Sequence, residues 1–590
     1  MKETLIDIET YSEVDIGKCG LYRYATDLSF EILLVAWATD EGDGFGETRC
    51  ADLASGEPLP KELLEDFQSG NVRLIAHNAS FERVCFSVHL NRHYPGQYLK
   101  PGEFLSPDSW ICTMVMAASL TLPMALKDVG TVLKTSQQKD KEGERLIKLF
   151  SMPCKPTKSN GMRTRNLPEH YPADWEKFKY YCIQDVNTEV DIYKRLKKFP
   201  MPEQEWKHYR VNERINDRGV KIDTELVQQA IACDLLLSDA MSKKAYELTG
   251  LENPNSVSQL KSWLDERGIP MDTLGKKDVA QMIEELDKNG VDAEAMDMLK
   301  LRLQMAKNSV KKYQAAERCV CSDGRARGLF QFYGASRTGR YSGRNIQLQN
   351  LPQNHISTLD EARELVKLGC FDMVETIYGN TPDVLSQLIR TMLIPKEGCE
   401  FIVADFSAIE ARVIAWLAGE QWVNEVFATH GKIYEATASQ MFHVPIEKIA
   451  KGNPEYSLRQ KGKVATLALG YQGGTAALIA MGALNMGLAE EELPDIVQRW
   501  RSANPRIRDL WYAVEQAALT TMQTAQPQGI YGLIFRYEGD LVYGQSFLTV
   551  QLPSGRKLFY PKPFLQENQF GKMAIHYYTV GQQTRKWEVA

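Results

Sequence analysis

The sequence has no apolar run that could cross a membrane. A spanning helix needs about 18 or more consecutive apolar residues, and no such run occurs among the 590 residues. The first ten residues, MKETLIDIET, also lack the apolar segment of a signal peptide and read as a strand. We therefore expect no membrane partner and a cytoplasmic location.

Cysteines with metal-binding spacing are also missing. None of the eleven cysteines forms a CxxC pair, and the nearest two, Cys319 and Cys321, are separated by one residue. This spacing argues against a zinc site and favours free thiols in a reducing compartment.

The chain has no overall positive charge to indicate nucleic-acid binding, since its formal net charge is −6. The local distribution differs. Between Lys300 and Arg344, eleven basic residues face only two acidic ones, Glu317 and Asp323. This pattern favours a stripe that faces phosphates, with a solvated helix surface as the alternative.

Two stretches carry residues suited to nucleotidyl transfer. In the first, Val403–Arg412 (VADFSAIEAR), the segment Phe401–Ala404 is predicted to be a strand that ends at Asp405. The following Ser407–Leu417 has helical periodicity. A carboxylate at a strand end is well placed to hold a divalent cation against a phosphate.

The second stretch is Arg459–Tyr471, RQKGKVATLALGY. Its members Arg459, Lys463, Leu467 and Tyr471 recur every four residues, so they share one face of a predicted helix. Cations one turn apart can clamp a polyphosphate, and an aromatic ring can stack on a base. Each stretch alone also fits an alternative without a catalytic role: an acidic strand end for the first, and a solvated basic helix face for the second.

The N-terminus suggests a second metal site. Leu5–Glu9 alternates strictly, so Asp7 and Glu9 point to one face of a strand while Ile6 and Ile8 enter the core. Two neighbouring carboxylates repel one another unless a cation neutralises them. Taken alone, this short pattern is a weak signal, and chance or a structural role explains it more often than a metal site does.

Two further segments accompany it. Val72–Ala76 is a short apolar strand followed by His77–Glu82, HNASFE. Trp175–Leu196 has helical periodicity and places Tyr181 and Asp185 one turn apart.

Together these residues resemble the family A DNA polymerases, the group of bacterial DNA polymerase I and its phage relatives. DFSAIEAR is similar to that family's first polymerase motif, and R-x3-K-x3-L-x3-Y to its nucleotide-binding helix. Further matches are Thr338–Ser342 (TGRYS), Leu348–Pro352 (LQNLP) and Lys432–Phe442 (KIYEATASQMF). The three N-terminal segments resemble the motifs of a DEDDy-type 3′–5′ exonuclease.

The resemblance implies a multi-domain α/β fold, in which a ribonuclease H-like 3′–5′ exonuclease domain precedes a right-hand polymerase body of thumb, palm and fingers. The expected divisions are 1–199 for the exonuclease, 200–334 for the thumb and linking helices, 335–420 for the palm with the first motif, 421–520 for the fingers, and 521–590 for a partial palm. A 5′-nuclease domain is not expected before Asp7, which favours a phage or prophage enzyme in a bacterial cell.

The resemblance also implies site residues. In the exonuclease, Asp7, Glu9, Glu82 and Asp185 would hold two metal ions and Tyr181 would orient the attacking water. Glu82 departs from the usual Asp. In the polymerase site, the implied metal ligands are Asp405 and the carbonyl of Phe406, and the implied sugar gate is Glu410. The implied nucleotide contacts are Tyr434, Arg459, Lys463, Leu467 and Tyr471, and the implied DNA contacts are Arg337, Arg340, Gln349 and Asn350.

Two of these nucleotide contacts depart from the family pattern. Leu467 stands where Phe or Tyr is usual, and Tyr434 where His is frequent. The implied cofactor is Mg²⁺, with Mn²⁺ as an alternative, at two ions per active site. The implied partners are primer–template DNA and dNTPs.

One motif of the family is missing from the sequence. Its third polymerase motif is a His-Asp pair that supplies a second metal-binding carboxylate, and no His-Asp dipeptide occurs here; His576 precedes Tyr577. The motifs that are present make a proofreading DNA polymerase the main hypothesis. The alternative is one component of a split or truncated polymerase, mainly an exonuclease and DNA-binding subunit until a second polypeptide supplies the missing carboxylate.

Periodicity predicts the helices between these sites. Thr224–Gly250 reads as a long amphipathic helix capped by Thr224, a shorter helix begins near Asn255, and Glu294–Cys319 reads as a second long helix. Residues 354–383 look like an insertion.

Overall fold

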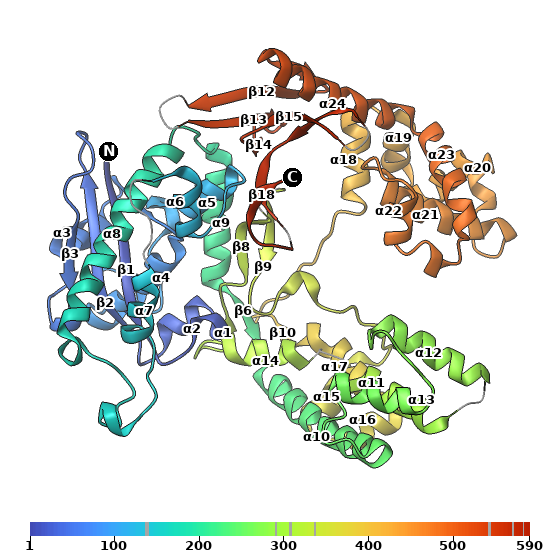
Figure 1. Cartoon of the computed structure of the whole chain (residues 1–590), viewed down its shortest axis with the longest axis horizontal. Helices are drawn as coiled ribbons and strands as arrows, with labels where there is room; N and C mark the ends of the chain where they lie inside the picture. Colours follow the sequence, from blue (N-terminus) through green and yellow to red (C-terminus); the bar gives the residue numbers. More distant parts are fainter. Residues whose placement is uncertain are drawn as a thin grey trace. The chain divides into compact units, whose positions relative to one another are not determined.

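The structure is a computed structural model that describes residues 1–135, 141–289, 292–305, 310–335, 338–540, 544–568, 571–581 and 583–590. The chain divides into two compact units, one holding most of residues 1–401 and the other most of residues 402–590 (Figure 1). Within the described ranges, no helix combines the length and the apolar character needed to cross a membrane.

The N-terminal part of the first unit is built on a five-stranded mixed sheet with the order β3-β2-β1-β4-β5. Its strands are β1 Lys2–Tyr11, β2 Glu31–Asp40, β3 Arg49–Asp52, β4 Val72–Ala76 and β5 Trp110–Cys112. Strand β1 pairs antiparallel with β2 and parallel with β4. The strands predicted at the N-terminus and at 72–76 are confirmed.

Helices cover this sheet on both faces. Adjacent side chains of β1, Leu5 and Ile6, point to opposite faces, and both are fully buried. The helices of this part are α1 Ile16–Cys19, α2 Leu21–Thr26, α3 Lys61–Gln68, α4 Ser80–His93, α5 Thr113–Ser119, α6 Leu126–Leu133, α7 Lys141–Phe150 and α8 Pro172–Leu196. Both α4 and α8 contact β1 and β2. The predicted helix at 175–196 is therefore confirmed, and it begins earlier because Pro172 fits a first helical turn.

The rest of the first unit is mainly helical. Its elements are α9 Glu203–Arg218, β6 Val220–Ile222, α10 Thr224–Thr249, α11 Val257–Glu266, α12 Lys276–Asn289, α13 Ala293–Met305, α14 Val310–Cys319, β7 Arg325–Ala326, β8 Phe330–Ala335, β9 Arg340–Gly343, α15 Leu359–Lys367, α16 Phe371–Tyr378, α17 Thr381–Leu388 and β10 Leu393–Ile394. Strands β10, β6 and β7 form one small sheet, and β8 pairs with β9.

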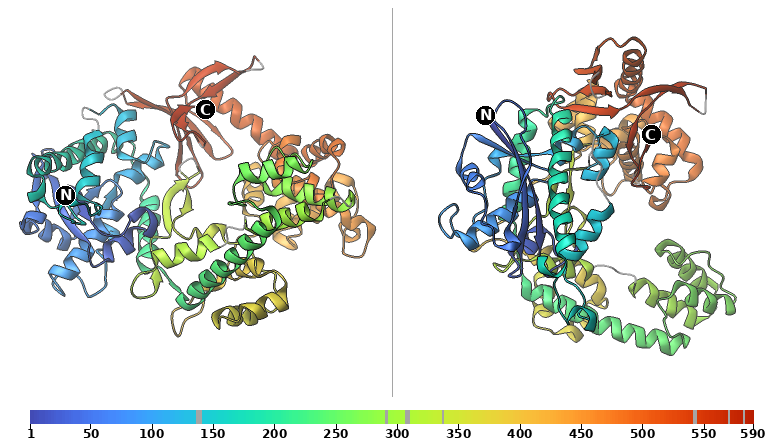
Figure 2. Two further views of the ribbon diagram at one scale, coloured as in Figure 1. Left: turned by 60° about the horizontal axis from the view of Figure 1, so that its bottom comes forward. Right: turned by 60° about the vertical axis from the view of Figure 1, so that its left-hand side comes forward.

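Helix α10 is the long green helix in Figure 2. Its C-terminal half shares an apolar core with α11 to α13, and its N-terminal half shares another with α14 to α17. The apparent insertion 354–383 thus supplies α15, which packs on α10, and α16, which contributes to the same core. The predicted cap was wrong: the side chain of Asp223, and not Thr224, accepts the Leu226 N–H, because Thr224 is already the first helical residue.

The second unit combines helices with small antiparallel sheets. Its helices are α18 Ile409–Ala418, α19 Gln421–Thr429, α20 Ile433–Phe442, α21 Leu458–Leu469, α22 Thr475–Ala480, α23 Leu493–Ala503 and α24 Pro505–Thr524. Its strands are β11 Gln528–Ile530, β12 Leu533–Asp540, β13 Gln545–Gln551, β14 Lys557–Pro561, β15 Phe564–Glu567, β16 Met573–His576, β17 Tyr578–Val580 and β18 Trp587–Val589. Strands β11 to β14 form one sheet in chain order.

The strand predicted at Phe401–Ala404 is not formed. This segment is irregular, and Ile402 and Val403 are 91% and 89% exposed. A strand exists only where a neighbour accepts and donates its backbone hydrogen bonds, and none of the described strands pairs with this segment. The predicted helix after it is confirmed as α18, which begins at Ile409 rather than Ser407.

Candidate active sites

Three acidic side chains of the first unit converge on one point. Asp7 and Glu9 come from β1, and Asp185 comes from α8. One carboxylate oxygen of each residue lies within 4.8 Å of the corresponding oxygens of the other two. Residues 178 positions apart in the sequence are thus brought to a spacing that suits a divalent cation.

Glu82 lies close by, although outside this group of three. It sits in the first turn of α4 and is 3% exposed. Burial, followed by the negative charge of Asp7, raises its pKa well above the ordinary value. Its Oε2 atom makes no hydrogen bond to the described residues. A buried carboxylate oxygen without a donor is costly, and a cation beside Asp7 would satisfy it, so this donor set fits a metal.

Tyr181 precedes Asp185 by one turn of α8. Burial, then the charge of Asp185, raise the pKa of its hydroxyl further above the ordinary value, at which a phenol already keeps its proton at neutral pH. Its ring packs against α7, where a Cβ atom on Gly143 would lie 2.0 Å from the Tyr181 Cε2 atom. Glycine at 143 is therefore required for the two helices to hold the ring in this place.

The second unit contains a cavity of about 320 Å³ at the first polymerase motif. The predicted residues that line it are Asp405, Phe406, Glu410, Tyr434, Leu467 and Tyr471. They come from the loop before α18, from α18 itself, from α20 and from the region of α21. Asp405 and Glu410 are the acidic residues among the described lining residues, and no second aspartate joins Asp405 there.

A glycine sets the spacing of the two helices that form one wall of the cavity. A Cβ atom on Gly462 of α21 would lie 2.2 Å from the Tyr434 carbonyl oxygen of α20. The backbones can therefore approach closely only at glycine. One turn later, the hydroxyls of Thr466 and Thr437 are 3.1 Å apart.

Arg459 and Lys463 are not among the lining residues. The guanidinium of Arg459 pairs with Glu435 at 2.7 Å and lies over the ring of Tyr434. Helix α21 ends at Leu469, so Tyr471 lies just beyond the helix whose face it was predicted to share. The predicted helix is otherwise confirmed.

Sequence reasoning missed several residues of the cavity wall. Thr437, Thr466, Trp500, Asn504 and Ile507 all line it. The last three come from α23, α24 and the turn between them. No spacing pattern links these positions to the motifs, because they are brought together only by the packing of separate helices.

The predicted DNA contacts lie around β9. Arg340, Gln349 and Asn350 are exposed, and Arg337 lies outside the described residues. A Cβ atom on Gly343 would lie 2.2 Å from the Gln349 Oε1 atom, so glycine leaves room for this side chain.

Part of the predicted basic stripe serves the fold instead. Arg325 donates to the Arg218 carbonyl, and Arg327 to the Asp217 carbonyl. Lys312 donates to the Ile346 carbonyl. These three cations bind backbone oxygens of the first unit, which the basic residue count could not reveal.

Comparison with known proteins settles the family. A sequence model for DNA polymerase family A matches residues 235–529. The DNA polymerase of Bacillus phage SP02 is 53% identical over 579 residues, which cover 98% of this chain and 85% of the phage protein. The chain belongs to the family A DNA polymerases.

More distant relatives agree. DNA polymerase I of Geobacillus stearothermophilus is 25% identical over 304 residues, which cover 51% of this chain but 30% of the bacterial protein. The POL domain of Pol1 from M. smegmatis was solved with DNA primer-template and dNTP. It matches the present structure at a TM-score of 0.53 and 16% identity, over 95% of this chain and 78% of the M. smegmatis chain. At this identity, the likeness supports the fold alone.

The family, the mixed α/β fold class and the activity predicted from the sequence are confirmed: the chain is a DNA-directed DNA polymerase that carries out template-directed synthesis. Enzymes of this family depend on metal ions. The comparisons give no support to the alternative of a split polymerase completed by a second polypeptide.

Proposed function

We propose that the cavity of the second unit is where the polymerase positions an incoming dNTP against primer–template DNA. The observation that supports this proposal most is the convergence of Asp405, Glu410, Tyr434, Leu467 and Tyr471 on one cavity. In this proposal, Asp405 and the Phe406 carbonyl are metal ligands, and Glu410 occupies the space beside the sugar that a 2′-hydroxyl would need.

Charge on α21 would complete nucleotide binding. Lys463 and Arg459 lie on the helix that forms one wall, and we assign both to the triphosphate. For Arg459 this requires the guanidinium to exchange Glu435 for phosphate oxygens, which it can also bind through two parallel hydrogen bonds. Arg340, Gln349 and Asn350 are assigned to the duplex, and Arg337 is assigned with them from the motif.

A second activity, 3′–5′ exonucleolytic hydrolysis, is favoured by the carboxylates of the first unit. Asp7, Glu9 and Asp185 each place a carboxylate oxygen within 4.8 Å of the others, and the buried Oε2 atom of Glu82 makes no hydrogen bond to the described residues. We assign Mg²⁺ to this site, at two ions, with Mn²⁺ as a substitute. Bound cations would activate a water molecule and stabilise charge on the phosphate.

The other residues of this site have roles that follow from their surroundings. Tyr181 keeps its proton, so its hydroxyl can donate a hydrogen bond to a water molecule or a phosphate oxygen. The apolar walls beside Glu9 include Phe81 and Met152, which border a cavity of about 460 Å³ that can receive a base.

The domain division follows these assignments. We place the exonuclease in residues 1–199, the thumb in 200–334, the palm in 335–420 and 521–590, and the fingers in 421–520. The setting we propose is the cytoplasm of a bacterial cell or of a phage-infected host, consistent with the phage relative.

Nucleotide incorporation tests the polymerase assignment. Asp405→Ala should lower incorporation on a primer–template by two or more powers of ten, roughly, because several kcal/mol of charge stabilisation is lost. Glu410→Ala should keep incorporating dNTPs but discriminate less against rNTPs, by about tenfold, which is about 1.4 kcal/mol. Incorporation by the Asp405→Ala variant at the wild-type rate would contradict the proposal, as would an unchanged dNTP-to-rNTP preference in Glu410→Ala.

A further inference from the structure

Helix α8 carries a third inward-facing polar residue beyond the two assigned above. Glu189 follows Asp185 by four residues, and Asp185 follows Tyr181 by four, so the three lie along one side of the helix. The side chain of Glu189 is 1% exposed. A buried carboxyl group of this kind needs hydrogen-bond partners.

A chain of hydrogen bonds leads away from Glu189. Its Oε1 atom is 2.9 Å from the Thr113 hydroxyl, and the backbone N–H of His77 lies near enough to its carboxyl group to favour the charged form. The Thr113 hydroxyl is 2.9 Å from His77 Nδ1, and His77 Nε2 is 2.8 Å from the Met124 carbonyl oxygen.

The chemistry of these groups fixes much of the proton arrangement. A carbonyl oxygen only accepts, so His77 Nε2 must donate to Met124. The Thr113 hydroxyl has one proton and lies between two groups, so it can donate to only one of them. Either Glu189 is ionised and His77 donates from both nitrogens, or Glu189 is protonated and donates to Thr113, which donates to a neutral His77. Both arrangements hold the same number of protons and the same net charge of zero.

These hydrogen bonds matter for the carboxylate cluster because of where His77 lies. His77 begins the segment HNASFE, which ends at Glu82 beside the carboxylate cluster. Within it, Asn78 has a φ of +72°, a left-handed conformation that needs support from its surroundings. Thr113 and Met124 hold the His77 ring directly before this turn, and Glu189 reaches the ring through Thr113.

We propose that Glu189, Thr113 and His77 are positioning residues of the exonuclease site, which clamp the turn leading to Glu82 against helix α8. The inference rests on the exonuclease function proposed above and adds three residues that it did not assign. Because the triad carries no net charge, it braces the site without adding to the repulsion among Asp7, Glu9 and Asp185. Burial and the charge of Asp7 raise the pKa of Glu189, in keeping with a proton shared inside the triad.

Substitutions at Thr113 and Glu189 test the clamp. Thr113→Val and Glu189→Ala each interrupt this series of hydrogen bonds. Each should slow metal-dependent hydrolysis of 3′ ends by about tenfold or more. Thr113→Ser restores the hydroxyl, and Glu189→Gln keeps an amide that can donate to the Thr113 hydroxyl. Both conservative variants should hydrolyse within about threefold of the wild type.

Thr188→Val is the matched control. Thr188 is buried on the same helix, but its hydroxyl donates only to the Gln184 carbonyl of its own helix at 2.8 Å. Like Thr113→Val, the substitution Thr188→Val removes a threonine hydroxyl from the same domain, but it should leave hydrolysis unchanged. Thr113→Val should also lower the melting temperature, because it leaves Glu189 and His77 buried without this partner. Hydrolysis by each variant is therefore compared well below its own melting temperature, which separates positioning from a general loss of stability.

A readout independent of activity completes the test. In protein labelled with ¹⁵N-histidine, the His77 signal is assigned by its loss in His77→Gln, and its ring shifts should show a protonated Nε2. A bare Nε2 would overturn the proton arrangement. Hydrolysis at the wild-type rate in both Thr113→Val and Glu189→Ala would overturn the inference and leave the exonuclease standing. A wild-type chain without 3′ hydrolysis would instead remove the proposed exonuclease, and with it the role of the triad.

Discussion

His89 is the residue at which burial has the plainest effect on protonation. It lies on α4, with its ring 4.3 Å from that of His93. Burial, then the charges of His93 and Arg92, lower the pKa of His89 to about 4. In the folded chain this histidine therefore stays neutral at pH values where an unfolded histidine is already charged.

The sign of the resulting pH effect follows from this difference. Between about pH 6.5 and pH 4, the unfolded state takes up a proton that the folded state refuses, so stability falls as the pH falls. At pH 5, the loss from this group is at most about 2 kcal/mol. His89→Phe should therefore lose less of its melting temperature between pH 7 and pH 5 than the wild type. The exposed His355 supplies a control, His355→Gln, which should behave as the wild type does; an identical pH dependence in His89→Phe would disprove the account.

At the scale of single residues, the sequence predicted best where a local pattern carried the information. Alternation along β1 placed Ile6 and Ile8 in the core and drew attention to Asp7 and Glu9, because strand periodicity is a local property. Glu189 escaped notice since nothing nearby marks it; its partners, Thr113 and His77, are distant in sequence.

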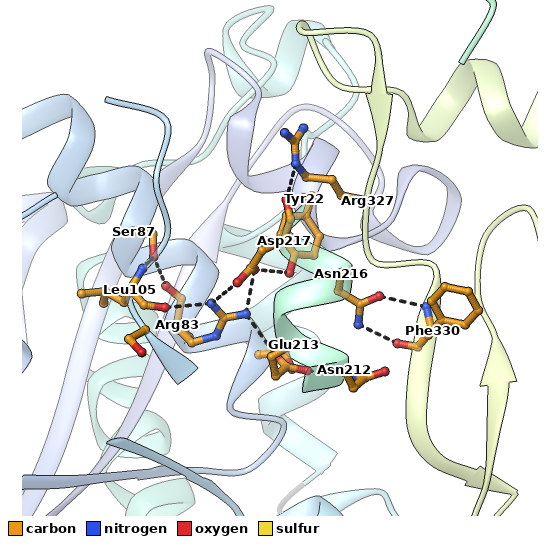
Figure 3. A network of polar contacts seen from close by, with 12 residues as sticks. Tyr22, Arg83, Ser87, Leu105, Asn212, Glu213, Asn216, Asp217, Arg327 and Phe330 are labelled. Atoms are coloured by element: carbon orange, nitrogen blue, oxygen red, sulfur yellow. Dashed lines mark hydrogen bonds and ion pairs between the residues drawn. The ribbon is translucent and has the colours of Figure 1, made fainter. Parts of the chain in front are cut away.

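At the scale of elements, helices α4 and α9 are joined by a buried ionic cluster (Figure 3). Arg83 of α4 is 1% exposed and binds both carboxylate oxygens of Asp217, at 2.9 and 2.8 Å. It also binds Glu213 at 3.0 Å. Ser80 and Tyr22 donate to the same two acids. Because α4 also carries Glu82, the cluster fixes the helix on which the proposed exonuclease site depends.

Removing the cation should be costly. Arg83→Met leaves the buried carboxylate of Glu213 and the partly buried carboxylate of Asp217 without their cation. A loss of about 3 to 5 kcal/mol in the free energy of unfolding is expected. The matched control is Arg145→Ala, which also removes an arginine paired with two acids, Glu142 and Asp174, but at the surface. It should cost much less, because solvent and salt screen an ion pair at the surface. Urea unfolding of both variants measures the difference, and equal losses would show that the buried cluster contributes no more than a surface pair.

Elements were predictable from the sequence when their stabilising contacts are local. The periodic helices α8, α10 and α21 were found, with errors of a few residues at their ends. The strand at Phe401–Ala404 was wrong because apolar sequence alone cannot supply a hydrogen-bonding neighbour. The link between α4 and α9 was invisible for a related reason, since Arg83 and Glu213 are 130 residues apart.

At the scale of the whole molecule, the polymerase carries two separate sets of candidate site residues. One lies on β1, α4 and α8 of the first unit, and the other lines the cavity of the second unit. They share no residue, so each activity should fail independently when its own carboxylates are removed. The order of motifs along the chain predicted this division, whereas the cavity walls from α23 and α24 required the structure.

The measurement that tests this claim most directly is hydrolysis of single-stranded DNA labelled at its 5′ end, with Mg²⁺ and without dNTPs. We predict that the wild type and Asp405→Ala shorten the strand from its 3′ end at equal rates, and that the double variant Asp7→Ala, Glu9→Ala does so slower by at least two powers of ten, roughly, because the metal ligands are lost. Chelation of the metal should stop the wild-type reaction. Undiminished hydrolysis in the double variant, or an equal loss in Asp405→Ala, would contradict the assignment of exonuclease chemistry to the first unit.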